Sequence, residues 1–273
     1  MKKSRRHALG QHFLINRGVL QKIIRTISPR ADELIIEIGP GKGALTIPLA
    51  QEAGKVIAIE KDKNLAANLK CMRIPHLIVV ENDVLKVDFR KMLGQEKTFE
   101  NRVKLVGNLP YSISTPLLFR VLEDKDLFPV AVFLVQKEVA ERVCAEPGSK
   151  RYAPLSILFQ RSFIVRLHFV VSPGSFSPPP KVESAVLYLR RRPDPLFEVG
   201  NEARFQKLLR AAFAHRRKLL IKNLEIGPYS PSRLAEAYEK LALRRMARPE
   251  ELTIAQFVGL FNFLLAEEDG SID

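Results

Sequence analysis

The sequence has no tryptophan and only two cysteines among its 273 residues. Cys71 and Cys144 are too few for a disulfide framework or a cysteine-rich zinc site, so we expect a reducing compartment and no bound metal. No run of about eighteen apolar residues occurs, and no apolar stretch follows the basic residues 1–7. This pattern argues against a membrane-spanning helix and a signal peptide. We therefore expect a soluble, cytoplasmic protein.

Acidic residues are missing from positions 1–30, which carry eight Lys or Arg. Residues 201–250 carry twelve Lys or Arg against five acidic residues, and the whole chain has a formal net charge of +14. A generic basic surface is one interpretation. Two basic segments favour a polyanionic partner, because each neutralised phosphate releases counterions. The candidate RNA-binding residues are Arg5, Arg6, Arg216, Arg217, Lys218 and Lys222.

Short β-branched runs alternate with helical patterns over the first two thirds of the chain. The predicted strands span residues 34–38, 55–60, 77–80, 103–106 and 130–135, and the predicted helices span 43–53 and 63–72. Nearly continuous apolar strands separated by helices are typical of a parallel sheet covered on both faces. Two later strands, at 164–171 and 184–189, would give this sheet an antiparallel end.

The pattern changes again near residue 190. Residues 190–200 contain Pro193 and Pro195 and are typical of a linker, and the apolar spacing from 202 to 265 predicts three or four helices. We predict an α/β catalytic domain over residues 1–192, whose first thirty residues form a basic segment. A small, basic, all-α RNA-binding domain is predicted over residues 201–273.

A glycine-rich loop, residues 37–43 (EIGPGKG), joins the first predicted strand to the first predicted helix. Glycines allow backbone N–H groups and a helix N-terminus to approach a ligand closely. The spacing of Gly39, Gly41 and Gly43 matches neither a P-loop nor the dinucleotide G-x-G-x-x-G pattern. A tight structural turn is the alternative interpretation.

Carboxylates follow the next two predicted strands. Glu60 ends the second strand, where an acid can accept both hydroxyls of a ribose. Asp83 follows the third strand, where it can accept from an adenine amino group. Either residue alone could be a solvated acid, but together with the loop they indicate a cleft shaped for adenosine. NAD is compatible with this cleft, and the glycine spacing favours S-adenosyl-L-methionine.

The tetrapeptide 108–111 (NLPY) follows the fourth predicted strand. The Asn108 side-chain carbonyl and the Leu109 backbone carbonyl can accept the two N6 hydrogens of adenine, which favours a pyramidal nitrogen. Pro110 fixes the turn, and Tyr111 offers a face for a flipped base. No metal or strong base is required, because a sulfonium already activates the methyl group. An ordinary turn at the end of a strand is the structural alternative.

These motifs, with residues 10–14 (GQHFL), 176–185 (FSPPPKVESA) and 212–218 (AFAHRRK), resemble those of the ribosomal RNA adenine N6,N6-dimethyltransferases, most of all the bacterial KsgA type. The likeness runs from residue 8 to about residue 225. It implies a seven-stranded, Rossmann-like class I methyltransferase sheet with a small helical domain. It also implies methylation, with S-adenosyl-L-methionine, of two adjacent adenines in a hairpin loop near the 3′ end of small-subunit (16S) rRNA.

The same resemblance implies a late pre-30S or 30S particle as partner, and nothing in the sequence indicates an oligomer, so we expect a monomer. Asn108, Leu109, Pro110 and Tyr111 match the target-adenine site, and Phe176 matches a residue that packs against the base. The sequence differs from many members at His12, where they have Asn. The predicted cofactor contacts are His12, Leu14, Gly39, Gly41, Glu60, Lys61, Asp83, Val84 and Asn108.

Three other functions share some of these features. A sister group that methylates large-subunit rRNA and confers macrolide resistance has the glycine loop and a similar tetrapeptide but lacks the basic 215–218 segment. DNA adenine methyltransferases more often have Asp in place of Asn108. The third alternative is a ribosome assembly factor without catalysis, which the presence of Gly39, Glu60, Asp83 and Asn108 disfavours.

Overall fold

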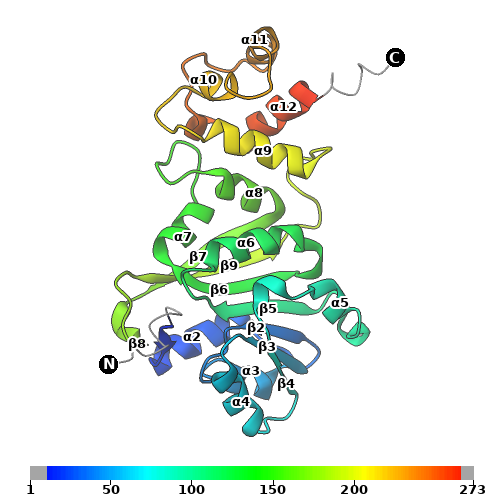
Figure 1. Ribbon diagram of the computed structural model, residues 1–273, viewed down its shortest axis with the longest axis vertical. Coiled ribbons are helices and arrows are strands. Elements are labelled where there is room, and N and C mark those ends of the chain that lie inside the picture. The colour runs from blue at the N-terminus through cyan, green and yellow to red at the C-terminus, as the bar shows by residue number, and fades with distance from the viewer. Residues whose placement is uncertain (1–10, 266–273) are drawn as a thin grey trace. The chain divides into compact units, whose positions relative to one another are not determined.

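The computed structural model describes residues 11–265, shown in Figure 1. The chain divides into two compact units, each built from two stretches of sequence. The first unit combines Met1–Ala140 with Ile164–Arg191, and the second combines Glu141–Phe163 with Arg192–Asp273. Among residues 11–265, no helix is long and apolar enough to cross a membrane.

Within residues 11–265, the strands all lie in the first unit, apart from the initial residue of β7. The strands are β1 (Phe13–Leu14), β2 (Leu34–Ile38), β3 (Lys55–Glu60), β4 (Leu77–Glu81), β5 (Val103–Asn108), β6 (Val130–Gln136), β7 (Phe163–Val171), β8 (Phe176–Ser177) and β9 (Ser184–Arg191). The helices around them are α2 (Arg17–Ile27), α3 (Thr46–Glu52), α4 (Lys63–Cys71), α5 (Phe89–Leu93) and α6 (Ser114–Glu123), and α7 (Lys137–Val143) follows β6.

Seven strands form one sheet in the order β4-β3-β2-β5-β6-β9-β7. Strands β2 to β6 pair in parallel, and β9 pairs antiparallel to β6. The predicted parallel sheet with an antiparallel end is therefore confirmed. The same register sets Ile38 opposite Ile59 on one side and Gly107 on the other, so three strands end side by side.

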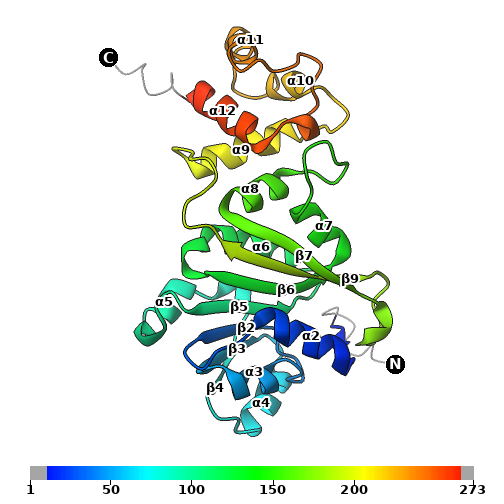
Figure 2. The ribbon, with the colours of Figure 1, turned by 180° about the vertical axis from the view of Figure 1, so that it is seen from behind.

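Helices cover both faces of this sheet. Every residue of β2 is buried, as expected for a central strand between two helical layers. Ile24 of α2 and Leu49 of α3 belong to one apolar cluster with Ile35 and Val106 of the sheet. Figures 1 and 2, which view the sheet from opposite sides, show α6 on one face and α2 and α3 on the other.

The helix predicted over 43–53 begins later than expected. Gly43 N–H donates to the Pro40 carbonyl at 2.9 Å, so the glycine loop closes into turns before α3 starts at Thr46. The helix predicted over 63–72 matches α4, where the Asp62 side chain accepts from the N–H groups of Asn64 and Leu65. Such capping supplies partners for backbone donors at the start of a helix.

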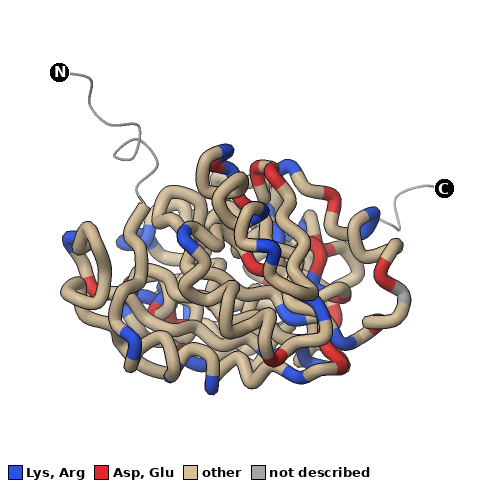
Figure 3. The backbone as a smooth tube through the Cα atoms, turned by 90° about the horizontal axis from the view of Figure 1, so that it is seen from below, with Lys and Arg blue, Asp and Glu red and all other residues tan. Residues whose placement is uncertain are grey.

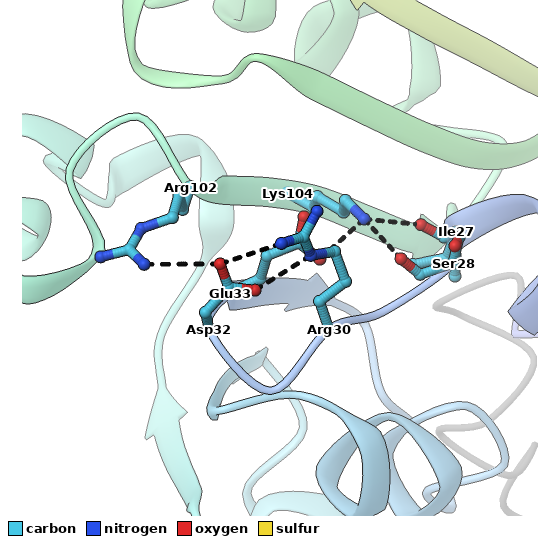
Figure 4. A network of polar contacts seen from close by, with 7 residues as sticks. All are labelled: Ile27, Ser28, Arg30, Asp32, Glu33, Arg102 and Lys104. Atoms are coloured by element: carbon cyan, nitrogen blue, oxygen red, sulfur yellow. Dashed lines mark hydrogen bonds and ion pairs between the residues drawn. The ribbon is translucent and has the colours of Figure 1, made fainter.

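A partly buried lysine of β5, Lys104, contacts the end of α2 (Figure 4). Lys104 Nζ lies 2.9 Å from the Ile27 carbonyl oxygen and 2.6 Å from that of Ser28, where the helix ends in a left-handed residue. The same nitrogen lies 2.7 Å from Glu33 Oε2. A cation at a helix C-terminus is favourable, and here it also joins the helix to the sheet.

The second unit is helical. It contains α8 (Pro154–Ser162), α9 (Glu202–Ala212), α10 (Leu220–Leu224), α11 (Pro231–Lys240) and α12 (Ile254–Leu265), and the last four match the helical spacing predicted over 202–265. Arg161 of α8 is buried, donates to the Phe197 carbonyl at 2.9 Å and pairs with Glu202 at the start of α9. This contact shows why α8 groups with the later helices. The functional division into residues 1–192 and 201–273 stays a prediction.

Candidate cofactor and target-base site

A cavity of about 200 Å³ opens where β2, β3 and β5 end. Because parallel strands end at one edge of a sheet, this edge collects loops from distant parts of the sequence. Asn108–Tyr111 and the glycine loop meet here, with the segment that contains β1. The lining residues are Gln11, His12, Phe13, Leu14, Ile15, Glu37, Gly39, Pro40, Gly41, Lys42, Ala44, Leu45, Glu60, Asn108, Leu109, Pro110, Tyr111 and Ser177.

The three loop glycines have φ angles of +64°, +59° and +84° at Gly39, Gly41 and Gly43. L-residues rarely adopt such angles, which explains the glycine at each position. A Cβ atom at Gly41 would lie only 3.0 Å from Cε1 of Phe13. The loop therefore approaches the β1 segment as closely as its backbone allows.

The Glu60 side chain is hydrogen-bonded to the backbone of this loop. Its Oε2 accepts from Gly41 N–H at 3.0 Å, and its Oε1 accepts from Asp62 N–H at 2.8 Å. The residue is buried, so these charge-assisted hydrogen bonds are shielded from water. The carboxylate predicted to bind ribose thus also orders the loop.

A second cavity of about 120 Å³ adjoins the first and shares Gln11, Gly39, Glu60 and Pro110 with it. Asp83 lies here, with its Oδ2 2.8 Å from Lys61 Nζ. The Lys61 ammonium holds the pKa of Asp83 below its usual range, so the carboxylate stays ionised and can accept hydrogen bonds. The structure brings the predicted contacts Lys61, Asp83 and Val84 together in this cavity.

Glu37 is a residue that the sequence interpretation did not assign to the site. It lines the larger cavity, and its Oε2 has no hydrogen-bond partner in the described part of the chain. Burial raises the pKa of Glu37 to about 8. With this pKa the carboxyl is mostly protonated at pH 7, and a cationic ligand in the cavity would favour its ionised form. The only sequence signal was its position at the start of the glycine motif.

The Asn108–Tyr111 turn is fixed at several points. Asn108 Nδ2 donates to the His12 carbonyl at 2.9 Å, and Leu109 N–H donates to the Leu134 carbonyl at 3.0 Å. The Tyr111 hydroxyl lies 2.8 Å from Ser184 Oγ on β9, and burial raises the pKa of this tyrosine. The amide of Asn108 is therefore oriented with its nitrogen toward His12 and its Oδ1 available as an acceptor.

Two predicted site residues lie deeper than the others. Leu14 is buried yet still lines the cavity. Phe176 is buried in the apolar cluster with Ile24 and Leu49, and its neighbour Ser177 reaches the cavity. The packing of Phe176 against a target base stays a prediction.

Arg5 and Arg6 lie outside the described residues. Arg216, Arg217 and Lys218 form an exposed turn after α9, and Figure 3 shows that lysines and arginines are interleaved with acidic residues along the described chain. The Arg216 guanidinium donates to the carbonyl of Lys150 and, at 3.0 Å, to that of Tyr152. Arg216 thus holds a neighbouring loop of its own unit.

The remaining basic candidate, Lys222 of α10, also has a partner. Its Nζ lies 2.8 Å from Glu225 Oε2, one helical turn further along the chain. The lysine side chain is mostly exposed, so the pair contributes little to stability and can yield to a phosphate. RNA binding by these basic residues stays a prediction.

S-adenosyl-L-methionine fits the residues of the two cavities. Glu37 Oε2 has no partner in the described part of the chain and can face a positive charge, and Gly39 and Gly41 line the larger cavity without a side chain. Glu60 and Asp83 supply acceptors at the ends of neighbouring strands. Lys42, which the sequence interpretation did not single out, also lines the larger cavity, with its Nζ 4.8 Å from the Phe13 ring centre.

The chain is similar in sequence to proteins that are named ribosomal RNA methyltransferases. It is 42% identical over 265 residues to Ribosomal RNA small subunit methyltransferase A of Geobacter sulfurreducens, covering 96% of this chain and 95% of that one. The protein of the same name from Acinetobacter baylyi is 42% identical over 259 residues, covering 93% and 90%.

Solved structures extend the likeness. A dimethyladenosine transferase from Plasmodium falciparum matches with a TM-score of 0.78 and 29% identity over 94% of this chain and 98% of that one. The 23S rRNA methyltransferase ErmE matches with a TM-score of 0.69 and 27% identity over 92% and 99%. The class I methyltransferase fold expected from the motifs is confirmed. A family model described as ribosomal RNA adenine dimethylase matches residues 2–265, and the chain belongs to that family.

Proposed function

We propose that this enzyme dimethylates N6 of two adjacent adenines in a hairpin loop near the 3′ end of small-subunit rRNA. The main support for this proposal is that the Asn108–Tyr111 turn and the glycine loop line one cavity. Relatives at 42% identity that are named for the small subunit support the choice of substrate. The particle is a late pre-30S or 30S subunit in the cytoplasm, and the enzyme acts as a monomer.

The cofactor is held by both cavities. Gly39 and Gly41 present backbone to it, Glu60 accepts from the ribose, and Asp83 accepts from the adenine amino group. Glu37, protonated while the site is empty, would lose its proton beside a cationic ligand and then compensate its positive charge. When bound, S-adenosyl-L-methionine supplies a methyl group on a positively charged sulfur, which is a good leaving group.

The target adenine is activated by position and by hydrogen bonds. Asn108 Oδ1 and the Leu109 carbonyl oxygen each accept one N6 hydrogen, which draws the nitrogen lone pair out of conjugation with the ring. The Asn108 amide cannot rotate freely, because its Nδ2 donates to the His12 carbonyl. Tyr111 stacks on the base, and its hydroxyl is anchored to Ser184. Much of the rate acceleration therefore comes from preorganisation.

Large-subunit rRNA is the second candidate substrate, since the fold is shared with the 23S rRNA methyltransferase ErmE at a TM-score of 0.69. The sequence identity to that protein is 27%, well below the 42% to the relatives named for the small subunit. A non-catalytic assembly factor is disfavoured, because Asn108, Glu60 and the glycine loop are present and lie together.

Transfer of labelled methyl groups to three acceptors tests the proposal. The acceptors are undermethylated small subunits, large-subunit RNA and DNA, each followed by nucleoside analysis. We expect N6,N6-dimethyladenosine in the small-subunit RNA alone. Label in large-subunit RNA would move the chain to the sister group. Binding to small subunits without label in any acceptor would make it an assembly factor.

A further inference from the structure

The segment around β1 joins the glycine-loop side of the site to the segment around β8. Leu14 pairs with Phe176 and Phe13 with Ser177, and Ile15 N–H donates to the Ser175 carbonyl at 2.9 Å. Pro178 follows β8 and has no N–H group, so it can accept but cannot donate a hydrogen bond in this ladder. A side chain makes the next link instead.

That side chain is His12. Its Nδ1 lies 2.8 Å from the Pro178 carbonyl oxygen. A carbonyl oxygen only accepts hydrogen bonds, so Nδ1 must carry the hydrogen. The imidazole therefore continues the β1–β8 ladder by one link, at the edge of the cavity that His12 lines.

The backbone of the same residue makes a second link. The His12 carbonyl accepts from Asn108 Nδ2 at 2.9 Å, and the imidazole centre lies 5.5 Å from that of the Tyr111 ring. One residue thus contacts the amide that orients the target base, the ring that stacks on it, and the carbonyl of Pro178. These contacts all lie within the first unit of the fold.

We propose that His12 is a positioning residue for the target adenine, whose Nδ1–H group holds the 175–178 segment against the Asn108–Tyr111 turn. This role rests on the proposed function, since the turn is taken as the target-base site. It differs from the role implied by the family resemblance, in which residue 12 contacts the cofactor. The imidazole then affects catalysis on RNA and leaves cofactor affinity largely unchanged.

Asparagine provides a matched control. Its Nδ2 is attached to Cγ, as Nδ1 is in histidine, so His12→Asn keeps an N–H donor at the same number of bonds from the backbone. His12→Leu keeps the branch at Cγ and removes the donor. His12 is partly exposed, so both variants are expected to fold, and His12→Ala serves as a second variant without a donor.

The first test compares steady-state kinetics on small subunits with cofactor affinity by calorimetry. In His12→Leu and His12→Ala, kcat/KM for the particle should fall about tenfold, the effect of one lost hydrogen bond, while the Kd of S-adenosyl-L-methionine changes less than about threefold. His12→Asn should stay within about threefold of the wild type in both measurements. An equal defect in the Asn and Leu variants, or cofactor affinity that falls as much as kcat/KM, would overturn the assignment.

The second test needs no activity. Hydrogen–deuterium exchange of the peptide that contains Ser175–Ser177 should be faster in His12→Leu and His12→Ala than in the wild type, and restored in His12→Asn. Unchanged exchange in the variants without a donor would contradict the link to Pro178. If even the wild-type enzyme methylates no small subunits, the proposed function fails, and the exchange result still decides whether His12 fixes this segment.

Discussion

At the scale of single residues, Glu37 makes the stability of the enzyme depend on pH. Burial raises its pKa to about 8 from an ordinary value of 4.5. Between about pH 5 and pH 8 the unfolded chain loses this proton and the folded chain keeps it. The free energy of unfolding should therefore decrease as pH rises through this range, by up to a few kcal/mol.

Urea denaturation of the cofactor-free enzyme from pH 5 to pH 9 measures this effect. Glu37→Gln carries a neutral side chain of the same shape, so the difference between the two proteins isolates the Glu37 carboxyl. The stability of the variant relative to the wild type should rise with pH. Parallel curves for the two proteins would show that Glu37 does not titrate differently in the folded state.

Asn108 is the residue on which the chemistry depends most. Asn108→Ala removes an acceptor for the N6 hydrogens and should lower kcat by ~100-fold or more. Cofactor affinity should change less, because Gly39, Glu60 and Asp83 remain. Asn108→Asp is the control, since it keeps an acceptor oxygen and loses the N–H donated to His12. Turnover at the wild-type rate in Asn108→Ala, in single-turnover assays, would remove this residue from the mechanism.

Two variants of Tyr111 distinguish stacking of its ring on the target base from anchoring of its hydroxyl to Ser184. Tyr111→Phe loses the contact with Ser184 but keeps the ring, so KM for the particle should rise no more than about tenfold. Tyr111→Ala also loses base stacking, worth ~1–3 kcal/mol, and KM should rise by a further ~5–150-fold. Cofactor affinity measured in parallel should be nearly constant. Equal KM values for Phe and Ala would exclude stacking on this ring.

At the scale of elements, the glycine loop depends on a carboxylate from the next strand. Glu60→Ala removes the acceptors for Gly41 and Asp62 together with the predicted ribose contact. The Kd of S-adenosyl-L-methionine, measured by calorimetry, should rise by about 10–150-fold, since hydrogen bonds to charged groups contribute about 1.5–3 kcal/mol. Glu60→Gln keeps one acceptor and should lie between. An unchanged Kd in Glu60→Ala would reject the ribose role.

The elements that the sequence predicted well are those with a long regular pattern. Strands β2, β3 and β6 are mostly apolar, and their parallel order follows from the helices between them. Strands β1 and β8 were not predicted, because two residues have no periodicity and their partners lie more than 160 positions apart. The start of α3 was predicted too early, because the loop glycines adopt left-handed turns instead of a helix.

The candidate site could be predicted in part, because several of its residues lie at the ends of strands that the sequence predicted well. Glu60 and Asn108 end their strands and Asp83 follows one, and the parallel register aligns these strand ends, so their convergence could be expected. Glu37 lies inside a strand pattern, where its burial and its orphaned oxygen depend on the surrounding fold. The link from His12 to Pro178 depends on a pairing that only the folded chain shows.

At the scale of the whole molecule, the exposed basic turn 216–218 predicts the salt dependence of RNA binding. Neutralising Arg217 and Lys218 to Gln should reduce the slope of log K against log[salt] by about 1.5–2, close to one ion per phosphate contact. Arg216→Gln alone should change the slope by less than about 0.5, because its guanidinium holds the carbonyls of Lys150 and Tyr152. Binding to small subunits at several salt concentrations measures both. An unaltered slope in the double variant would make the turn an ordinary solvated surface.

The division of the chain into units also belongs to this scale. Residues 154–162 were not assigned to an element from the sequence, and the structure joins α8 to the C-terminal helices through the buried Arg161. A single arginine in an apolar segment does not reveal its partner, since Glu202 lies 41 positions away. Units built from separate stretches of the chain depend on long-range contacts, so they cannot be predicted from local sequence patterns.

Counting modified nucleosides tests directly whether this enzyme dimethylates two adjacent adenines. Undermethylated small subunits are treated to completion with the enzyme and S-adenosyl-L-methionine, and the rRNA is digested and analysed by mass spectrometry, with Asn108→Ala as the matched control. We expect two adjacent N6,N6-dimethyladenosines per RNA molecule, in one fragment, and a strongly reduced yield with the variant at equal times. Full conversion by Asn108→Ala, or no dimethyladenosine with the wild type, would contradict it.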